Sequence, residues 1–188
     1  MDDRERHILE VTIGLLAEEG LGIPTARIAR AAGVANGTLF NVFPTKQALL
    51  DRVYVTLKGE MTATFGSLDL AGGDFVAAMG GAWRSYVLWA VSAPDRHRVM
   101  HLLKGGGAVS PAAVAEGEQV FAEVSRFVEA EMAAGRLMAI GFTHFVRLAE
   151  AEADVVIALA REGGVTGAAL DALIDRGFSV FLNGVTSR

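Results

Sequence analysis

The chain has 188 residues, a net charge of −5 and no cysteine. Its length suffices for one sizeable core, or for a small head on a larger body. Apolar residues make up 52% of the chain and charged residues 21%, which excludes a disordered protein and leaves apolar surface for an oligomer or a ligand. The missing cysteines exclude disulfides and thiolate metal sites. The acidic charge argues against indiscriminate nucleic-acid binding, since phosphate neutralisation supplies most of such affinity.

Signals for export or membrane insertion are missing from the sequence. No apolar segment with a cleavage site follows Met1, and no uninterrupted apolar run reaches the ~20 residues that a membrane helix needs. We therefore expect a soluble, cytoplasmic protein without a membrane partner.

The first helix is predicted over residues 3–19, because Ile8, Val11, Leu15 and Leu16 recur at helical spacing and Gly20 follows as a stop. Pro24 predicts the start of a second helix, since a proline in the first turn loses no helical hydrogen bond.

Residues 25–46 then contain two short helical patterns around a tight turn. The first pattern has a small apolar face, the turn is Gly33-Val34-Ala35, and Leu39 with Phe43 gives the second pattern a buried face. The apolar face of the first pattern consists of Ile28, Ala29 and Ala32. This arrangement predicts a helix-turn-helix, in which residues 35–41 form the recognition helix.

The exposed side chains expected on the recognition helix are few, short and polar. They are Asn36, Thr38 and Asn41, and Gly37 allows close approach. Such residues suit contacts with base edges and phosphates.

The order AGVANGTLFNVFPTK, which follows the Ile28-Ala29 pair, resembles the N-terminal DNA-binding domain of the tetracycline repressor (TetR) family of transcription regulators. The resemblance covers about the first third of the chain. It combines the AGV turn, the Gly-Thr pair, two aromatic residues spaced by three, and a lysine after the helix-breaking Pro44. It implies an operator-binding homodimer, usually a repressor, that responds to a small molecule.

The resemblance also implies roles for individual residues in DNA binding. Backbone contacts are expected from Thr25, Arg27, Thr38 and Lys46, and base contacts from Asn36 and Asn41, with Gly37 permitting approach. Phe40 stands where many relatives carry a tyrosine whose hydroxyl reaches phosphate, so only apolar contact remains, such as with a thymine methyl. Residues 1–60 hold seven Lys and Arg against eight Asp and Glu, so we expect one head alone to bind weakly and to depend on dimerisation.

Thr45 is the predicted N-cap of a longer helix over residues 46–65. Its N-terminus and the charge of Lys46 should attract a DNA phosphate. This helix connects a head, residues 1–47, to a body, residues 48–188. After loop signals at residues 66–73, the body is predicted as helices over 74–93, 94–103, 111–134, 143–162 and 167–184. No alternating strand pattern occurs, so we expect an all-α protein.

A stripe of aromatic residues on the helix over 74–93 indicates either core or a ligand pocket. Most such stripes are core, but tyrosine and tryptophan carry polar edges that suit a pocket wall. Together with the resemblance, the stripe predicts a pocket for a small apolar or aromatic effector. Its expected lining is Met61, Phe65, Met79, Trp83, Tyr86, Trp89, Met100 and Phe121.

The last two helices are apolar on more than one side, which predicts that they pack on their own core and on a twofold copy as a four-helix interface. The family pattern agrees. The expected interface residues are Phe145, Val156, Leu159, Leu173, Phe178 and Phe181.

Other constellations favour ordinary structural explanations. The glycines at 105–107 lack the flanks of a phosphate loop. His97 and His101 have the spacing of a metal pair but no third ligand nearby, so surface or lining histidines are favoured. Glu150 and Asp154 share a face that we expect to be solvated. We therefore expect no enzyme activity, no cofactor and no metal. Two alternatives remain: a DNA-binding regulator without an effector, and a helical carrier or enzyme with a vestigial head.

Overall fold

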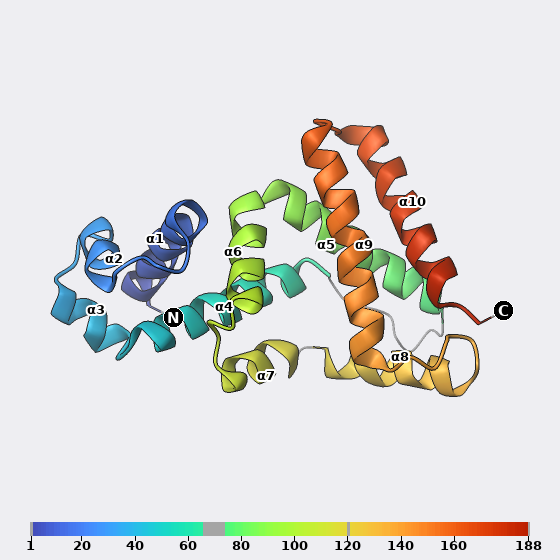
Figure 1. Ribbon diagram of the computed structural model, residues 1–188, viewed down its shortest axis with the longest axis horizontal. Coiled ribbons are helices and arrows are strands. Elements are labelled where there is room, and N and C mark those ends of the chain that lie inside the picture. Colours follow the sequence, from blue (N-terminus) through green and yellow to red (C-terminus); the bar gives the residue numbers. More distant parts are fainter. Residues whose placement is uncertain (1, 66–73, 120, 188) are drawn as a thin grey trace. The chain divides into compact units, whose positions relative to one another are not determined.

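The computed structural model describes residues 2–65, 74–119 and 121–187, which form ten helices and no strand (Figure 1). The helices are α1 Asp3–Glu19, α2 Thr25–Ala31, α3 Asn36–Val42, α4 Lys46–Ala63, α5 Phe75–Ser92, α6 Pro94–Gly105, α7 Pro111–Gln119, α8 Ala122–Ala133, α9 Phe142–Glu162 and α10 Gly167–Val185. The predicted all-α fold is confirmed. None of the described helices is both long and apolar enough to cross a membrane.

Most predicted helices are found within two residues of their expected ends. One prediction is wrong: the single helix over residues 111–134 is two helices, α7 and α8, and Phe121 is the N-cap of the second. The nearest glycine or proline is Gly117, inside α7, and residues 118–122 hold neither, so the sequence has only a weak local signal for this break. The loop predicted at residues 66–73 lies outside the described residues.

The chain divides into two compact units. Unit 1 consists of Met1–Met61 and Ala93–Gln119, and unit 2 of Thr62–Ser92 and Val120–Arg188. The segment 93–119, which carries α6 and α7, therefore folds with the N-terminal helices.

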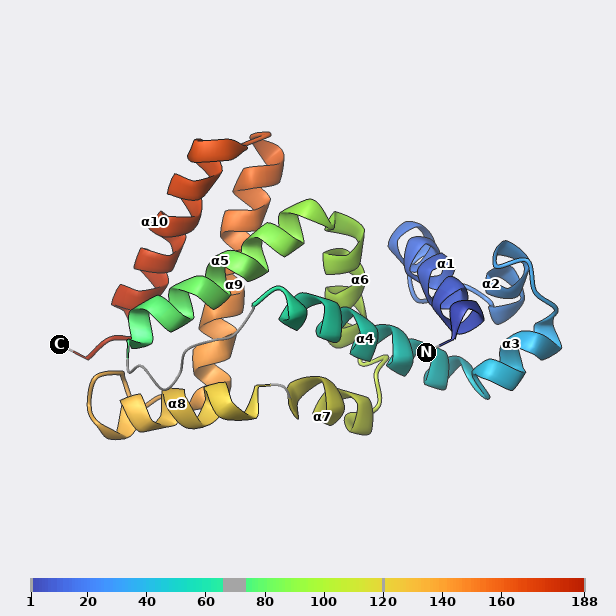
Figure 2. The same ribbon diagram turned by 180° about the vertical axis from the view of Figure 1, so that it is seen from behind.

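In unit 1, α1 packs on α2 and α6, and α2 packs on α3 (Figure 2). The side chain of Asp2 caps α1 by accepting a hydrogen bond from the Glu5 N–H at 2.7 Å. The core of this unit is aliphatic around one tyrosine, and the fully buried side chains include Ile8, Leu9, Leu16, Ile28, Leu39, Val53, Tyr54 and Leu57.

In unit 2, α9 and α10 lie side by side, and α5 packs against both (Figures 1 and 2). Gly177 permits close approach between α10 and α9, because an added Cβ would lie against the side chain of Val156. The end of the chain is tied to the segment before α9, where the Met138 N–H donates to the Val185 carbonyl at 2.8 Å.

Candidate DNA-binding site and ligand-binding region

The surface of α3 presents a continuous exposed face. Asn36, Gly37, Phe40 and Asn41 are all exposed, and their spacing of one, four and five residues places them on one side of the helix. Leu39 is buried on the other side. Phe40 keeps 38% of its surface exposed. The face therefore combines two side-chain amides, a glycine that leaves the backbone accessible, and an aromatic ring.

The turn before α3 is fixed by buried apolar residues and by glycine. Ile28, Ala29 and Ala32 are buried, and the Val34 N–H donates to the Ala29 carbonyl at 3.0 Å. Gly33 has φ +66°, a left-handed conformation that glycine adopts at little cost. The helix-turn-helix predicted from these residues is therefore present.

The start of α4 holds both a cap and a lysine with structural partners. The Thr45 hydroxyl accepts the Ala48 N–H at 3.0 Å, which confirms the predicted cap. The Lys46 Nζ donates to the carbonyls of Leu21 and Ile23, both at 2.7 Å. These bonds hold the α1–α2 connection to α4, a role of Lys46 that no local pattern in the sequence indicates. An ammonium has three donors, so a contact with phosphate remains compatible with both bonds.

Of the three remaining predicted backbone contacts, Thr38 is half-buried on α3, and the other two lie on α2. Thr25 is half-buried and Arg27 is exposed. Arg27 pairs with Glu19 at 3.2 Å, an exposed ion pair of the kind that contributes little to stability. Breaking this ion pair therefore costs little free energy.

Helix α6 is joined to the N-terminal helices by a charged network. Arg96 donates to Glu10 of α1 at 2.7 Å and lies 3.5 Å from Glu60 of α4. Burial raises the pKa of the Glu60 carboxyl, although the charge of Arg96 opposes this effect. The sequence gives no signal for this network, because the partners lie 36 and 86 residues from Arg96.

A second connection joins α4 to the segment between α6 and α7. The Gln47 Nε2 donates to the Ala108 carbonyl at 2.7 Å and to the Asp51 carboxylate at 2.8 Å. The Ser110 N–H also donates to that carboxylate at 2.8 Å. Burial raises the pKa of Asp51, but the hydrogen bonds from Ser110 and Gln47 outweigh it and leave this pKa below its ordinary value.

Among the residues predicted to line a pocket, Trp83 is part of the packing between α5 and α10. Its indole N–H donates to the Ile174 carbonyl at 3.2 Å. Its ring stacks on Phe181, with centroids 5.8 Å apart and an interplanar angle of 8°. The polar edge that suggested a ligand is therefore satisfied by the backbone.

Tyr86 and Trp89 lie further along α5 and stack on each other with centroids 6.3 Å apart. Burial raises the pKa of the Tyr86 phenol, and the negative charges of Asp154 and Glu150 on α9 raise it further, while Arg161 opposes them. This part of unit 2 thus combines two aromatic rings with carboxylates, in contrast to the solvated face expected for Glu150 and Asp154.

The other predicted pocket residues are divided between the units. Phe65 and Phe121 contact each other in unit 2, with ring centroids 6.2 Å apart. Met79 is buried in unit 2, and Met61 and Met100 are buried residues of unit 1.

The predicted interface residues on α9 and α10 differ in their exposure. Phe145, Val156 and Phe181 are buried, Leu173 and Phe178 are half-buried, and only Leu159 is exposed. Large apolar residues that are exposed on these two helices are Leu148, Val155, Leu159 and Val180. These four side chains, rather than the buried three, are available to a second copy.

Comparison with known proteins places the N-terminal helices in a family. The sequence profile described as "Bacterial regulatory proteins, tetR family" matches residues 8–53, which confirms the resemblance predicted from residues 25–46. The nucleoid occlusion factor SlmA of Actinobacillus pleuropneumoniae is 41% identical over 68 residues. That match covers 33% of this chain and 34% of the relative, so the chain matches about a third of the curated relative's length.

Solved structures share the fold over almost the whole chain. A TetR family transcription regulator from Marinobacter aquaeolei VT8 superposes with a TM-score of 0.85 at 19% identity, covering 98% of this chain and 96% of the other. The TetR-like regulator LfrR from Mycobacterium smegmatis, solved in complex with proflavine, gives a TM-score of 0.63 at 16% identity, covering 100% and 99%.

Proposed function

The chain belongs, through its N-terminal helices, to the tetR family of bacterial regulatory proteins, and we propose that it is a cytoplasmic, ligand-responsive transcriptional repressor that binds a palindromic operator as a homodimer. The observation that carries the proposal is the exposed face of α3, where Asn36, Gly37, Phe40 and Asn41 lie together. We assign residues 1–47 to DNA binding and residues 48–188 to ligand binding and dimerisation. No catalytic role is proposed.

Recognition of DNA is proposed to use α3 in the major groove. Asparagine suits a bidentate contact with adenine, and Phe40 suits a thymine methyl. Thr25, Arg27, Thr38 and Lys46 would contact the sugar-phosphate backbone and set the register. Two heads related by a twofold axis would enter successive major grooves about 34 Å apart.

The dimer is proposed to form through α9 and α10. Val155 and Leu159 on α9 are 51% and 50% exposed, and Val180 on α10 is 60% exposed. A second copy of the same two helices would cover these side chains in a four-helix arrangement, in which each patch contacts its own twofold mate. Because the charge of the head is nearly balanced, operator affinity should depend on this pairing.

The effector is proposed to be a small aromatic molecule that binds in unit 2 beside Tyr86 and Trp89. Stacked rings offer an apolar wall, and nearby carboxylates can orient a polar or cationic group. LfrR, which shares the fold, was solved in complex with proflavine, which supports a search among planar aromatic molecules. Effector binding would tilt α4, which begins at Lys46, and so change the separation of the heads. A coupling of about 1–3 kcal/mol corresponds to a 5- to 150-fold loss of operator affinity.

The proposal is tested first by selecting operator sequences from a random duplex library with the purified full chain. We expect a palindromic consensus. Alanine at Asn41 should relax the preference at one base of each half-site, whereas alanine at Lys46 should weaken all sequences alike. Because Lys46 also holds the α1–α2 connection, the unfolding of that variant must be measured alongside. Gln119→Ala is the matched control, since Gln119 is an exposed amide on α7, outside the head and outside α9 and α10.

The dimer and the effector are tested separately. Leu159→Glu should give a monomer in sedimentation and lose most operator affinity. A planar aromatic library can be screened by Trp fluorescence, and a ligand found in this way should lower operator affinity, while DNA lowers ligand affinity by the same factor. Selection that returns no consensus would exclude sequence-specific regulation, and ligand binding that leaves DNA affinity unchanged would exclude the coupling.

A regulator without an effector is the second candidate. The observation that favours it is Trp83, whose ring and N–H are both engaged inside unit 2. If no small molecule changes operator affinity although the selection succeeds, this second function replaces the first.

A further inference from the structure

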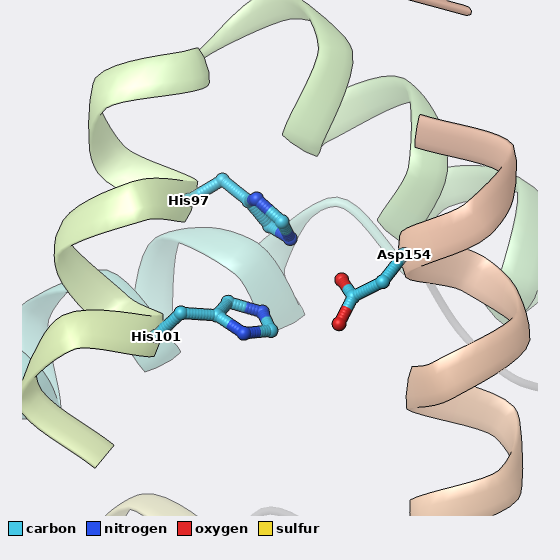
Figure 3. A group of neighbouring side chains, drawn as sticks. All are labelled: His97, His101 and Asp154. Atoms are coloured by element: carbon cyan, nitrogen blue, oxygen red, sulfur yellow. The ribbon is translucent and has the colours of Figure 1, made fainter. Parts of the chain in front are cut away.

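Helix α6 carries two histidines on consecutive turns whose rings lie against each other. The centroids of His97 and His101 are 4.3 Å apart, with an interplanar angle of 47° (Figure 3). His97 is buried and His101 is half-buried. Both lie on α6, within unit 1.

We propose that His97 and His101 together bind one divalent transition-metal ion, preferentially Ni²⁺ or Cu²⁺. Histidines four residues apart on a helix project from one face and can share an ion, as the two histidines of helical zinc motifs do. Imidazole nitrogen is a good ligand for these metals. The inference concerns metal binding alone and is independent of whether the chain binds DNA.

The ring separation favours an ion with ligands at right angles. A ligating nitrogen lies about 2.0–2.1 Å from the metal, so each ring centroid would lie about 3.2 Å from it. Two such rings have centroids about 4.5 Å apart when the two metal–nitrogen bonds form an angle of 90°, but about 5.2 Å apart when they form the tetrahedral angle. The observed 4.3 Å is close to the first value. Right-angled positions are typical of octahedral or square-planar Ni²⁺ and Cu²⁺ rather than of tetrahedral Zn²⁺.

The surroundings of the pair hold the helix in place. Arg96, which precedes His97, is bonded to Glu10 of α1 and lies beside Glu60 of α4. At the other end of α6, an added Cβ on Gly106 would lie 2.7 Å from a methyl carbon of Leu21, so the C-terminal cap is closely packed as well. The backbone that carries the two imidazoles is therefore fixed at both ends, which reduces the ordering cost of binding an ion. The remaining coordination positions would be filled by water or by other oxygen ligands.

Calorimetric titration of the untagged full chain with Ni²⁺ alone tests the proposal. We expect one ion per chain, a rise in Tm with Ni²⁺ concentration, and weaker binding of Zn²⁺. His97→Ala and His101→Ala should each lower the Ni²⁺ affinity at least tenfold. The chain has four histidines, so His7→Ala and His144→Ala, at exposed positions, are matched controls that should bind as the wild type does.

A spectroscopic measurement distinguishes the loss of a metal ligand from misfolding, which substitution of the buried His97 can cause. Electron paramagnetic resonance of the Cu²⁺ form should show coupling to two imidazole nitrogens in the wild type and to one in His101→Ala, whose helical circular dichroism should be unchanged. Failure of the wild type to bind Ni²⁺ or Cu²⁺ stoichiometrically would overturn the proposal. So would unchanged affinity in His101→Ala, or loss of binding in a control variant.

Discussion

The polar residues of α3 and the aromatic residues of α5 are both patterns on a single helix, but the structure exposes the first and packs the second against neighbouring helices. On α3, Asn36 and Asn41 remain exposed. On α5, Trp83 is buried, and its N–H bonds to the carbonyl of Ile174. Short polar residues on a small helix have few burial partners, whereas a large ring is buried wherever the tertiary structure offers an apolar surface. A polar pattern therefore points to function more directly than an aromatic one.

The largest expected effect on stability is at Trp83, and it tests whether this residue of α5 belongs to the core. Trp83→Ala should lower the free energy of unfolding by about 3–5 kcal/mol, because it leaves a cavity beside Phe181 and an unpaired Ile174 carbonyl. Urea denaturation measures this change. Leu88→Ala on the same helix should stay within about 0.5 kcal/mol, because Leu88 is partly exposed. A stable Trp83→Ala that loses only effector binding would instead make Trp83 a pocket residue.

A smaller effect is expected at the contact between α10 and α9. Gly177→Ala should lower the free energy of unfolding by about 1–3 kcal/mol, because the new methyl group would overlap Val156 and force the helices apart. Gly184→Ala on the same helix has open space around it, and alanine is the better helix former. That control should be neutral or stabilising in thermal unfolding. Equal effects at both positions would mean that the close contact between α10 and α9 does not require a glycine at position 177.

The sequence predicts the head better than the connections that hold it. Glycine, proline and threonine mark the ends of α1, α2 and α4, since these signals act over a few residues. The partners of Lys46 lie 25 and 23 residues away, and such pairs depend on how the chain folds back. The sequence predicts a phosphate contact for Lys46, and no local pattern indicates the two carbonyls to which it donates.

In the body, residues 48–188, local sequence patterns also fail to predict two features of the structure. The pattern over residues 111–134 predicts one helix, because the only glycine or proline after Pro111 is Gly117, which lies inside α7 and not at the break that follows Gln119. On α9 and α10, periodicity identifies apolar residues but cannot tell which side faces the core. Phe145 and Val156 turned out to be buried within unit 2, and Val155 is exposed. Assigning residues to a core or to an interface requires the fold.

The carboxylate of Asp51 tests whether the contacts around the head contribute to its stability. Asp51→Asn should lower the free energy of unfolding by about 0.5–1.5 kcal/mol at pH 7, since it weakens the bonds from Ser110 and Gln47. The pKa of Asp51 is lowered in the folded state. Its contribution is therefore present above the unfolded pKa of about 4 and is lost as pH falls through the folded value.

Urea denaturation between pH 7 and pH 3 measures this dependence. The wild type should lose stability below about pH 4 more steeply than Asp51→Asn, so the difference between the two proteins should shrink as pH falls. A difference that stays constant over this range would mean that Asp51 acts through packing and not through its charge. Asp95→Asn, an exposed carboxylate in the first turn of α6, is the control for the general effect of removing an acid.

The smallest expected effect is a small increase in stability, and it tests the role of the exposed face of α3. Gly37 lies inside α3 with open space around it in the free protein. Alanine forms helices better than glycine by up to about 1 kcal/mol, so Gly37→Ala should stabilise the head slightly in thermal unfolding. If α3 approaches DNA closely at this position, the same methyl group should weaken operator binding. Higher stability with weaker binding would show that Gly37 serves the contact with DNA, whereas unchanged binding would leave the amides of Asn36 and Asn41 as the determinants on this face.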